Sequence, residues 1–88
     1  MVDENKINGF LLDIEHEYTK ARKKHPPMHS AHEGISVIRE EFEELWDHVK
    51  ADTAHTDAAY TEAVHLATMA MAFALEINGK LMDYQKTE

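Results

Sequence analysis

The sequence predicts an all-α protein, an antiparallel bundle of three main helices within one domain spanning residues 1–88. Alanine, leucine, methionine and glutamate, which favour helix, are common, whereas there are only three glycines and two prolines. Apolar residues recur in steps of three and four along three stretches, and polar or proline-containing segments separate these stretches. Because 88 residues build only a small core, we expect dimerisation to complete a larger bundle.

The first helix is predicted from about Asp3 to Lys24. Its apolar stripe consists of Ile7, Phe10 or Leu11, Ile14, Tyr18 and Ala21. Pro26 and Pro27 end the helix, just after a basic cluster made of Lys20, Arg22, Lys23 and Lys24. Cations suit the negative end of a helix dipole, so the cluster has a purely structural interpretation. The alternative interpretation is a patch that contacts phosphate.

The second helix is predicted from a capping box, in which Ser30 is the N-cap and Glu33 reaches back to it. It extends to about Ala51, with an apolar stripe of Ile35, Ile38, Phe42, Leu45 and Val49. Glu41 lies about 60° from the centre of this stripe, at 100° per residue. Glu44 lies further round the same side, and Trp46 flanks the opposite edge.

The third helix follows the polar connector 52–57 and is predicted to stop at Asn78-Gly79. Its apolar stripe consists of Leu66, Met69 or Ala70, Phe73 and Ile77. One turn earlier the stripe reaches Glu62, an unusual position because glutamate is rarely buried without a partner. His65 lies to one side of Glu62. Residues 80–88 are predicted to form a C-terminal tail that includes Leu81, Met82 and Tyr84 as docking candidates.

Two motifs carry candidate chemistry, Glu41-x-x-Glu44 and Glu62-x-x-His65. Each places two ligand-type side chains on neighbouring turns of one helix face. If the two helices pack side by side, three carboxylates and an imidazole face one another. Carboxylates that close repel unless a cation, usually divalent, lies between them. The simpler alternative is a solvated acidic helix face, with His65 as a half-buried, hydrogen-bonded histidine.

Composition excludes several classes of function. The net charge of −8 argues against nucleic acid and anionic membrane as partners. The absence of cysteine excludes disulfides, thiolate nucleophiles and cysteine-based zinc sites. The three glycines are isolated, so there is no glycine-rich phosphate loop. No apolar run approaches the roughly 20 residues of a membrane span, and the polar start is unlike a secretory signal, so we expect a cytoplasmic protein.

The segment from Ile38 to Leu45 resembles the E-E-x-x-E-L helix of the all-α NTP pyrophosphatases, the MazG-like and dimeric dUTPase superfamily. Glu62 to Ala67 is similar to the E-x-x-D segment on the next helix of that family. The resemblance implies that magnesium ligands are Glu41, Glu44, Glu62 and, by position, His65. His65 departs from the family's aspartate, and an imidazole in its place lowers the expected affinity for Mg²⁺ and favours Mn²⁺.

The resemblance further implies a nucleoside triphosphate pyrophosphohydrolase that converts NTP or dNTP to the monophosphate plus pyrophosphate, acting as a homodimer or a higher homo-oligomer. The basic cluster of the first helix would approach the phosphates, and Trp46 or Phe42 would face the base. Either a carboxylate or His65 would act as the general base. Two alternatives remain: a catalytically weakened or non-catalytic dimeric binding module, and a di-iron carboxylate bundle, since Glu-x-x-His is also the ligand set of that class.

Overall fold

A computed structural model describes residues 1–79 of the chain, and the predicted tail 80–88 lies outside this range. All regular structure within residues 1–79 is helical, which confirms the all-α prediction. The elements are α1 (Glu4–Lys24), α2 (Ala31–Lys50), α3 (Asp57–Phe73) and η1 (Ala74–Asn78), a π-helical turn that continues α3. The predicted helix bounds are therefore confirmed, whereas the π-helical turn was not predicted.

The helix ends follow local capping. The side chains of Asp3, Ser30 and Thr56 accept hydrogen bonds from backbone N–H groups in the first turns of α1, α2 and α3. The predicted capping box is only half right. The Glu33 carboxylate accepts from the backbone N–H of His29 at 2.7 Å, one residue before the N-cap, and so fastens the incoming loop to α2.

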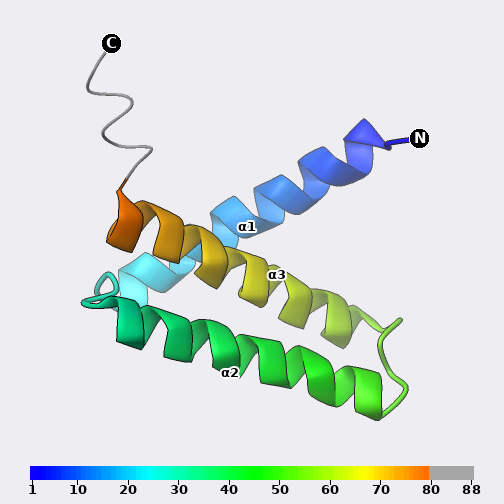
Figure 1. The fold of residues 1–88 in the computed structure, drawn as a ribbon. Helices are drawn as coiled ribbons and strands as arrows, with labels where there is room; N and C mark the ends of the chain where they lie inside the picture. Colours follow the sequence, from blue (N-terminus) through cyan, green and yellow to red (C-terminus); the bar gives the residue numbers. More distant parts are fainter. Residues whose placement is uncertain (80–88) are drawn as a thin grey trace.

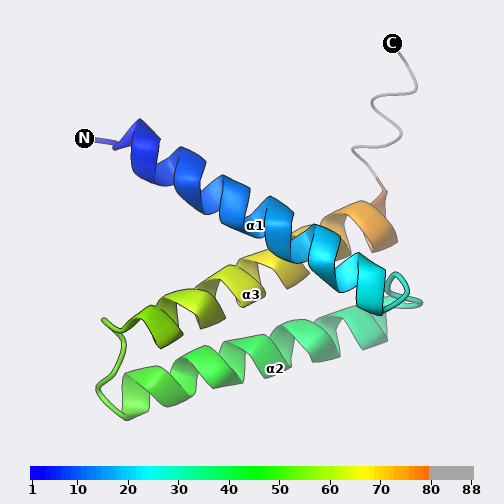
Figure 2. The same cartoon turned by 180° about the vertical axis from the view of Figure 1, so that it is seen from behind.

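The helix α3 lies between the other two helices, and α1 and α2 make little contact with each other (Figures 1 and 2). It runs antiparallel to α2, while α1 crosses it obliquely so that the N-terminal half of α1 projects away. The buried positions are mostly small. They are Ile14, Gly34, Ala59, Val64, Thr68 and Ala72. Small side chains let α3 approach both neighbours closely, which fixes the relative placement of side chains on its two sides.

The face that α2 turns to α3 differs from the predicted apolar stripe. Ile35, Phe42 and Val49 were expected in the core, yet each is about half exposed. Ile38 and Leu45 of the predicted stripe are half-buried, as expected. The other buried or half-buried positions are Gly34, Val37, Glu41 and His48, which the stripe did not include. Because α3 contacts only one edge of the stripe, the rest has no partner within residues 1–79. This orientation of α2 about its axis also brings the Glu41 carboxylate into the interface with α3.

The close approach of α2 to the end of α3 depends on Gly34. A Cβ atom at this position would lie 2.7 Å from the ring of Phe73 and 3.0 Å from the sulfur of Met28. Glycine therefore sets the distance between α2 and α3 at the end of the bundle that adjoins the loop between α1 and α2.

A buried ionic network ties α1, this loop and η1 together. The Glu76 carboxylate accepts hydrogen bonds from Arg22 at 2.5 and 2.7 Å, from the Tyr18 hydroxyl at 2.6 Å and from the Met28 backbone N–H at 2.9 Å. The side chain of Glu76 is only 8% exposed and that of Arg22 19% exposed. Four donors to one carboxylate hold the loop in a defined position.

Among the described residues, the helix spanning Asp57–Asn78 is long and apolar enough to cross a membrane, judged by length and composition. The core helix of a soluble protein meets the same criterion, so one such helix is weak evidence for a membrane span. In this structure the helix is sandwiched between α1 and α2 and carries Glu62 and Glu76.

Candidate metal centre

Three side chains from two helices converge on one point. Glu41 comes from α2, and Glu62 and His65 come from neighbouring turns of α3. One ligand atom of each lies within 4.8 Å of the ligand atoms of the other two. The Nδ1 atom of His65 lies 3.7 Å from an Oε2 atom of both carboxylates. Two carboxylates and an imidazole at these separations form a ligand set that can hold a divalent cation.

The electrostatics of this cluster favour a cation. The Oε2 atoms of Glu41 and Glu62 are buried and accept no hydrogen bond. Burial, followed by repulsion from Glu44, raises the pKa of Glu41 above its usual value. Buried oxygens without a partner are costly, and a bound cation would satisfy them.

Glu44 lies beside the converged group but is not a member of it. Its side chain is exposed. A hydrogen bond with Glu62, burial and repulsion from the same carboxylate together raise the pKa of Glu44. The sequence predicted four ligands, whereas three of those residues converge and the fourth lies at the exposed rim.

The structure adds Glu17, which the sequence reasoning missed. Its Oε2 atom lies 3.6 Å from Nε2 of His65, on the side of the ring opposite Glu41 and Glu62. The other oxygen of Glu17 pairs with Lys20 at 3.8 Å. A signal existed in the sequence, since Glu17 falls on the apolar stripe of the first helix, in line with Ile14, just as Glu62 falls on the stripe of the third.

The predicted substrate residues are scattered. Arg22 is held by Glu76, and Lys20 borders the metal centre through Glu17. Lys23 and Lys24 are exposed. Trp46 is about half exposed, with the Lys50 ammonium 6.0 Å from its ring centroid. Of these residues, only Arg22 lines either of the two cavities that adjoin the metal centre and the loop.

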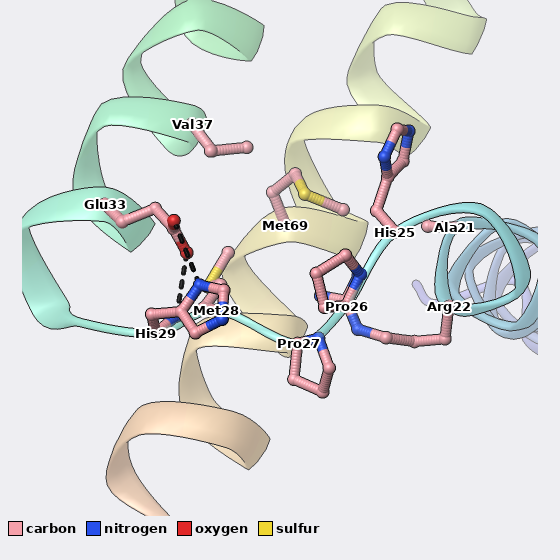
Figure 3. Close-up of a pocket in the computed structure, with 10 residues that line it drawn as sticks. All are labelled: Ala21, Arg22, His25, Pro26, Pro27, Met28, His29, Glu33, Val37 and Met69. Atoms are coloured by element: carbon pink, nitrogen blue, oxygen red, sulfur yellow. Dashed lines mark hydrogen bonds and ion pairs between the residues drawn. The ribbon is translucent and has the colours of Figure 1, made fainter.

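A cavity of about 280 Å³ opens beside the converged side chains. Its lining comprises Glu17, Ala21, His25, Val37, Glu41, His65, Thr68 and Met69. A second cavity of about 290 Å³ shares four of these residues and extends to the loop (Figure 3). Its remaining lining comprises Arg22, Pro26, Pro27, Met28, His29 and Glu33. The two cavities thus adjoin, with carboxylates at one end and apolar side chains from the loop at the other.

Figure 3 shows how the loop forms the wall of the second cavity. Val37 extends from α2 toward α3, and Met69 extends from α3 toward His25 and Pro26. The dashed contacts between His29 and Glu33 fasten the loop to α2. The Glu76 network anchors the same loop from the opposite side through Met28.

Comparison of this chain with protein-family models, with curated proteins and with solved structures gave no match.

Proposed function

We propose that this protein is a Mg²⁺- or Mn²⁺-dependent nucleoside triphosphate pyrophosphohydrolase, which converts an NTP or dNTP and water to the monophosphate and pyrophosphate. The observation that carries the proposal is the convergence of Glu41, Glu62 and His65, of which Glu41 and His65 also line the adjoining cavity. Protein ligands on one side and open space on the other leave room for phosphate oxygens and a water.

The chemistry divides between the cation and the chain. A divalent cation bound at this centre would neutralise the phosphate oxygens and increase the acidity of water. Glu41 and Glu62 would hold it with their buried oxygens. The water oxygen bonds to the α-phosphorus, the bond between this phosphorus and the α–β bridging oxygen breaks, and pyrophosphate leaves.

We assign the general base to Glu44. It is exposed at the rim of the centre, next to the candidate ligands but outside the converged group, so it is free to accept a proton from water. His65 is less suited to this role because both of its ring nitrogens already face carboxylates. The proton released by the attacking water is thus taken up by Glu44.

The two adjoining cavities suggest the orientation of the nucleotide. Its phosphates would lie at the carboxylate end, and its nucleoside would extend past Val37 and Met69 toward the loop. Lys20 is the member of the predicted basic cluster that borders this carboxylate end, through its pairing with Glu17. Arg22 instead serves the loop, because Glu76 holds its guanidinium.

The same proposal includes a homodimer. Ile35, Phe42, Trp46 and Val49 form an exposed apolar stripe along one face of α2, each between 47% and 57% exposed. A second copy of the chain that packs on this stripe would bury it and complete a larger bundle.

The test is pyrophosphate release by the purified protein from a panel of NTPs and dNTPs with Mg²⁺ or Mn²⁺. We expect release with at least one nucleotide, faster with Mn²⁺ because of the imidazole ligand, and a loss of at least about 100-fold in Glu41→Gln and Glu62→Gln. The matched control is Glu43→Gln, which changes an exposed carboxylate of α2 that pairs with Arg39. Absence of release from every nucleotide, or full activity in Glu41→Gln, refutes the proposal.

The same preparation separates the two alternatives. Glu62 and His65 also form the Glu-x-x-His set of di-iron bundles, so bound iron with near-ultraviolet absorption would favour that class. Metal binding without turnover would favour a non-catalytic module. In that case His65→Asp, which restores an anionic oxygen ligand, should strengthen Mg²⁺ binding.

A further inference from the structure

We infer that Glu17 is a positioning residue that orients the His65 imidazole toward the metal. This inference rests on the metal centre of the proposed function and extends it to a third helix, α1. The two nitrogens of the ring face different partners. Nδ1 faces Glu41 and Glu62 at 3.7 Å, whereas Nε2 faces Glu17 at 3.6 Å.

A neutral imidazole carries a proton on one ring nitrogen and a lone pair available for bonding on the other, so one nitrogen can bind a metal while the other donates a hydrogen bond. The nitrogen that binds a metal must present its lone pair. Donation of the Nε2 proton to Glu17 leaves the lone pair on Nδ1, directed at the point where the buried oxygens of Glu41 and Glu62 converge. Metal-binding histidines commonly donate their second N–H to a carboxylate, which fixes the ring and increases its basicity.

The placement of Glu17 fits this role better than direct ligation. Glu17 is not a member of the converged group, because its carboxylate approaches the ring from the opposite side. The separation of 3.6 Å is slightly longer than a hydrogen bond, and a small side-chain rotation can close it. Lys20 pairs with the other oxygen of Glu17, and Ile14 anchors this part of α1 in the core.

The pairing also bears on the substitution of histidine for a carboxylate at this position. Imidazole brings no negative charge to a centre that holds a divalent cation. Glu17 returns one negative charge to the far side of the ring, where hydrogen bonding transmits part of it to Nδ1. The packing of α1 on α3 thereby becomes part of the metal centre.

The test measures Mn²⁺ binding by following free Mn²⁺ with electron paramagnetic resonance. Glu17→Ala should weaken binding about 10- to 100-fold, the range seen when such a supporting carboxylate is removed. Glu17→Gln keeps an accepting oxygen without the charge and should lose less. Glu15→Ala is the matched control, because it removes an exposed carboxylate from the same helix and should bind Mn²⁺ like the wild type.

A second measurement separates positioning from a general charge effect. In the His65→Ala background, Glu17→Ala should cause no further loss of Mn²⁺ affinity, since there is no ring left to orient. Bound Mn²⁺ should show the ¹⁴N spin-echo modulation of a coordinated imidazole in the wild type, and this signal should be weaker in Glu17→Ala. Circular dichroism establishes that each variant is folded, and Glu17→Gln carries the test if Glu17→Ala is not.

Additive losses in the double variant, or Glu17→Ala binding Mn²⁺ like the wild type with an unchanged ¹⁴N signal, would overturn this inference. Neither result would affect the proposed function, provided that the wild type still releases pyrophosphate. A wild-type protein that binds no Mn²⁺ and releases no pyrophosphate would overturn both.

Discussion

Replacing Glu76 by glutamine should destabilise the protein strongly, although this residue lies outside the candidate metal centre. Its carboxylate accepts four hydrogen bonds, two from Arg22 and one each from Tyr18 and the Met28 backbone. Glutamine keeps the size of the side chain but removes the charge, and its amide group presents hydrogens to some of these donors.

The expected loss is about 2–3 kcal/mol of unfolding free energy. Breaking a fully buried ion pair costs about 3–5 kcal/mol, because the remaining charge lacks a partner. Arg22 is 19% exposed, so water can solvate part of its guanidinium and reduce the cost. Since a chain of this size has a total stability of about 4–13 kcal/mol, the loss is a substantial share of it.

The assay is urea denaturation followed by helical circular dichroism. For a small domain the dependence of unfolding free energy on urea is about 1 kcal/mol per molar, so the midpoint should fall by about 2–3 M. Glu15→Gln, an exposed change on α1, should shift the midpoint by less than about 0.5 M.

Comparison with Arg22→Ala and the double variant tests whether the two residues act together. The two single losses should sum to more than the double loss by at least about 1 kcal/mol. A loss below about 1 kcal/mol in Glu76→Gln, or strict additivity with Arg22→Ala, would refute the reasoning that this network holds α1, the loop and η1 together.

Three further predictions concern other parts of the molecule. Burial raises the pKa of Glu76, but its hydrogen bonds outweigh burial and leave this pKa below the usual glutamate value, so the network stabilises the protein above the ordinary glutamate pKa and loses this effect as pH falls through the pKa of Glu76 in the folded state. Urea midpoints measured from pH 6 to pH 3 should therefore fall less in Glu76→Gln than in the wild type, and an equal fall in both proteins would contradict this prediction. Gly34→Ala should lower the unfolding free energy by about 1 kcal/mol in the same assay, because overpacking against Phe73 costs about 1–3 kcal/mol while the higher helix propensity of alanine contributes about 1 kcal/mol of stability. A stabilised variant would show that the Phe73 ring moves aside freely. Phe42→Glu and Trp46→Glu, which place charges on the exposed apolar stripe of α2, should convert a dimer to a monomer in sedimentation equilibrium with little change in helix content. A wild-type protein that is monomeric at all concentrations would show that this stripe is not a dimer interface.

The number and the ends of the three main helices follow from local sequence signals, whereas the π-helical turn does not. Ser30 accepts from the N–H of Glu33 three residues later, and Pro26 follows His25, the C-cap of α1. These signals act within a few residues, so no tertiary contact is needed to interpret them. The alignment of Glu62 with an apolar stripe likewise predicted that a carboxylate would enter the interior, as its half-buried position shows.

Only the tertiary structure decided which side chains meet. The rotation of α2 about its axis turned Glu41 inward and left Phe42 exposed, because α3 contacts one edge of the stripe and an apolar stripe alone does not specify which edge is covered. The contacts of Glu17 with His65 and of Arg22 with Glu76 join residues 48 and 54 positions apart. Such contacts depend on the crossing angle and spacing of the helices, which small buried residues of α3 set and which periodicity along one helix does not encode.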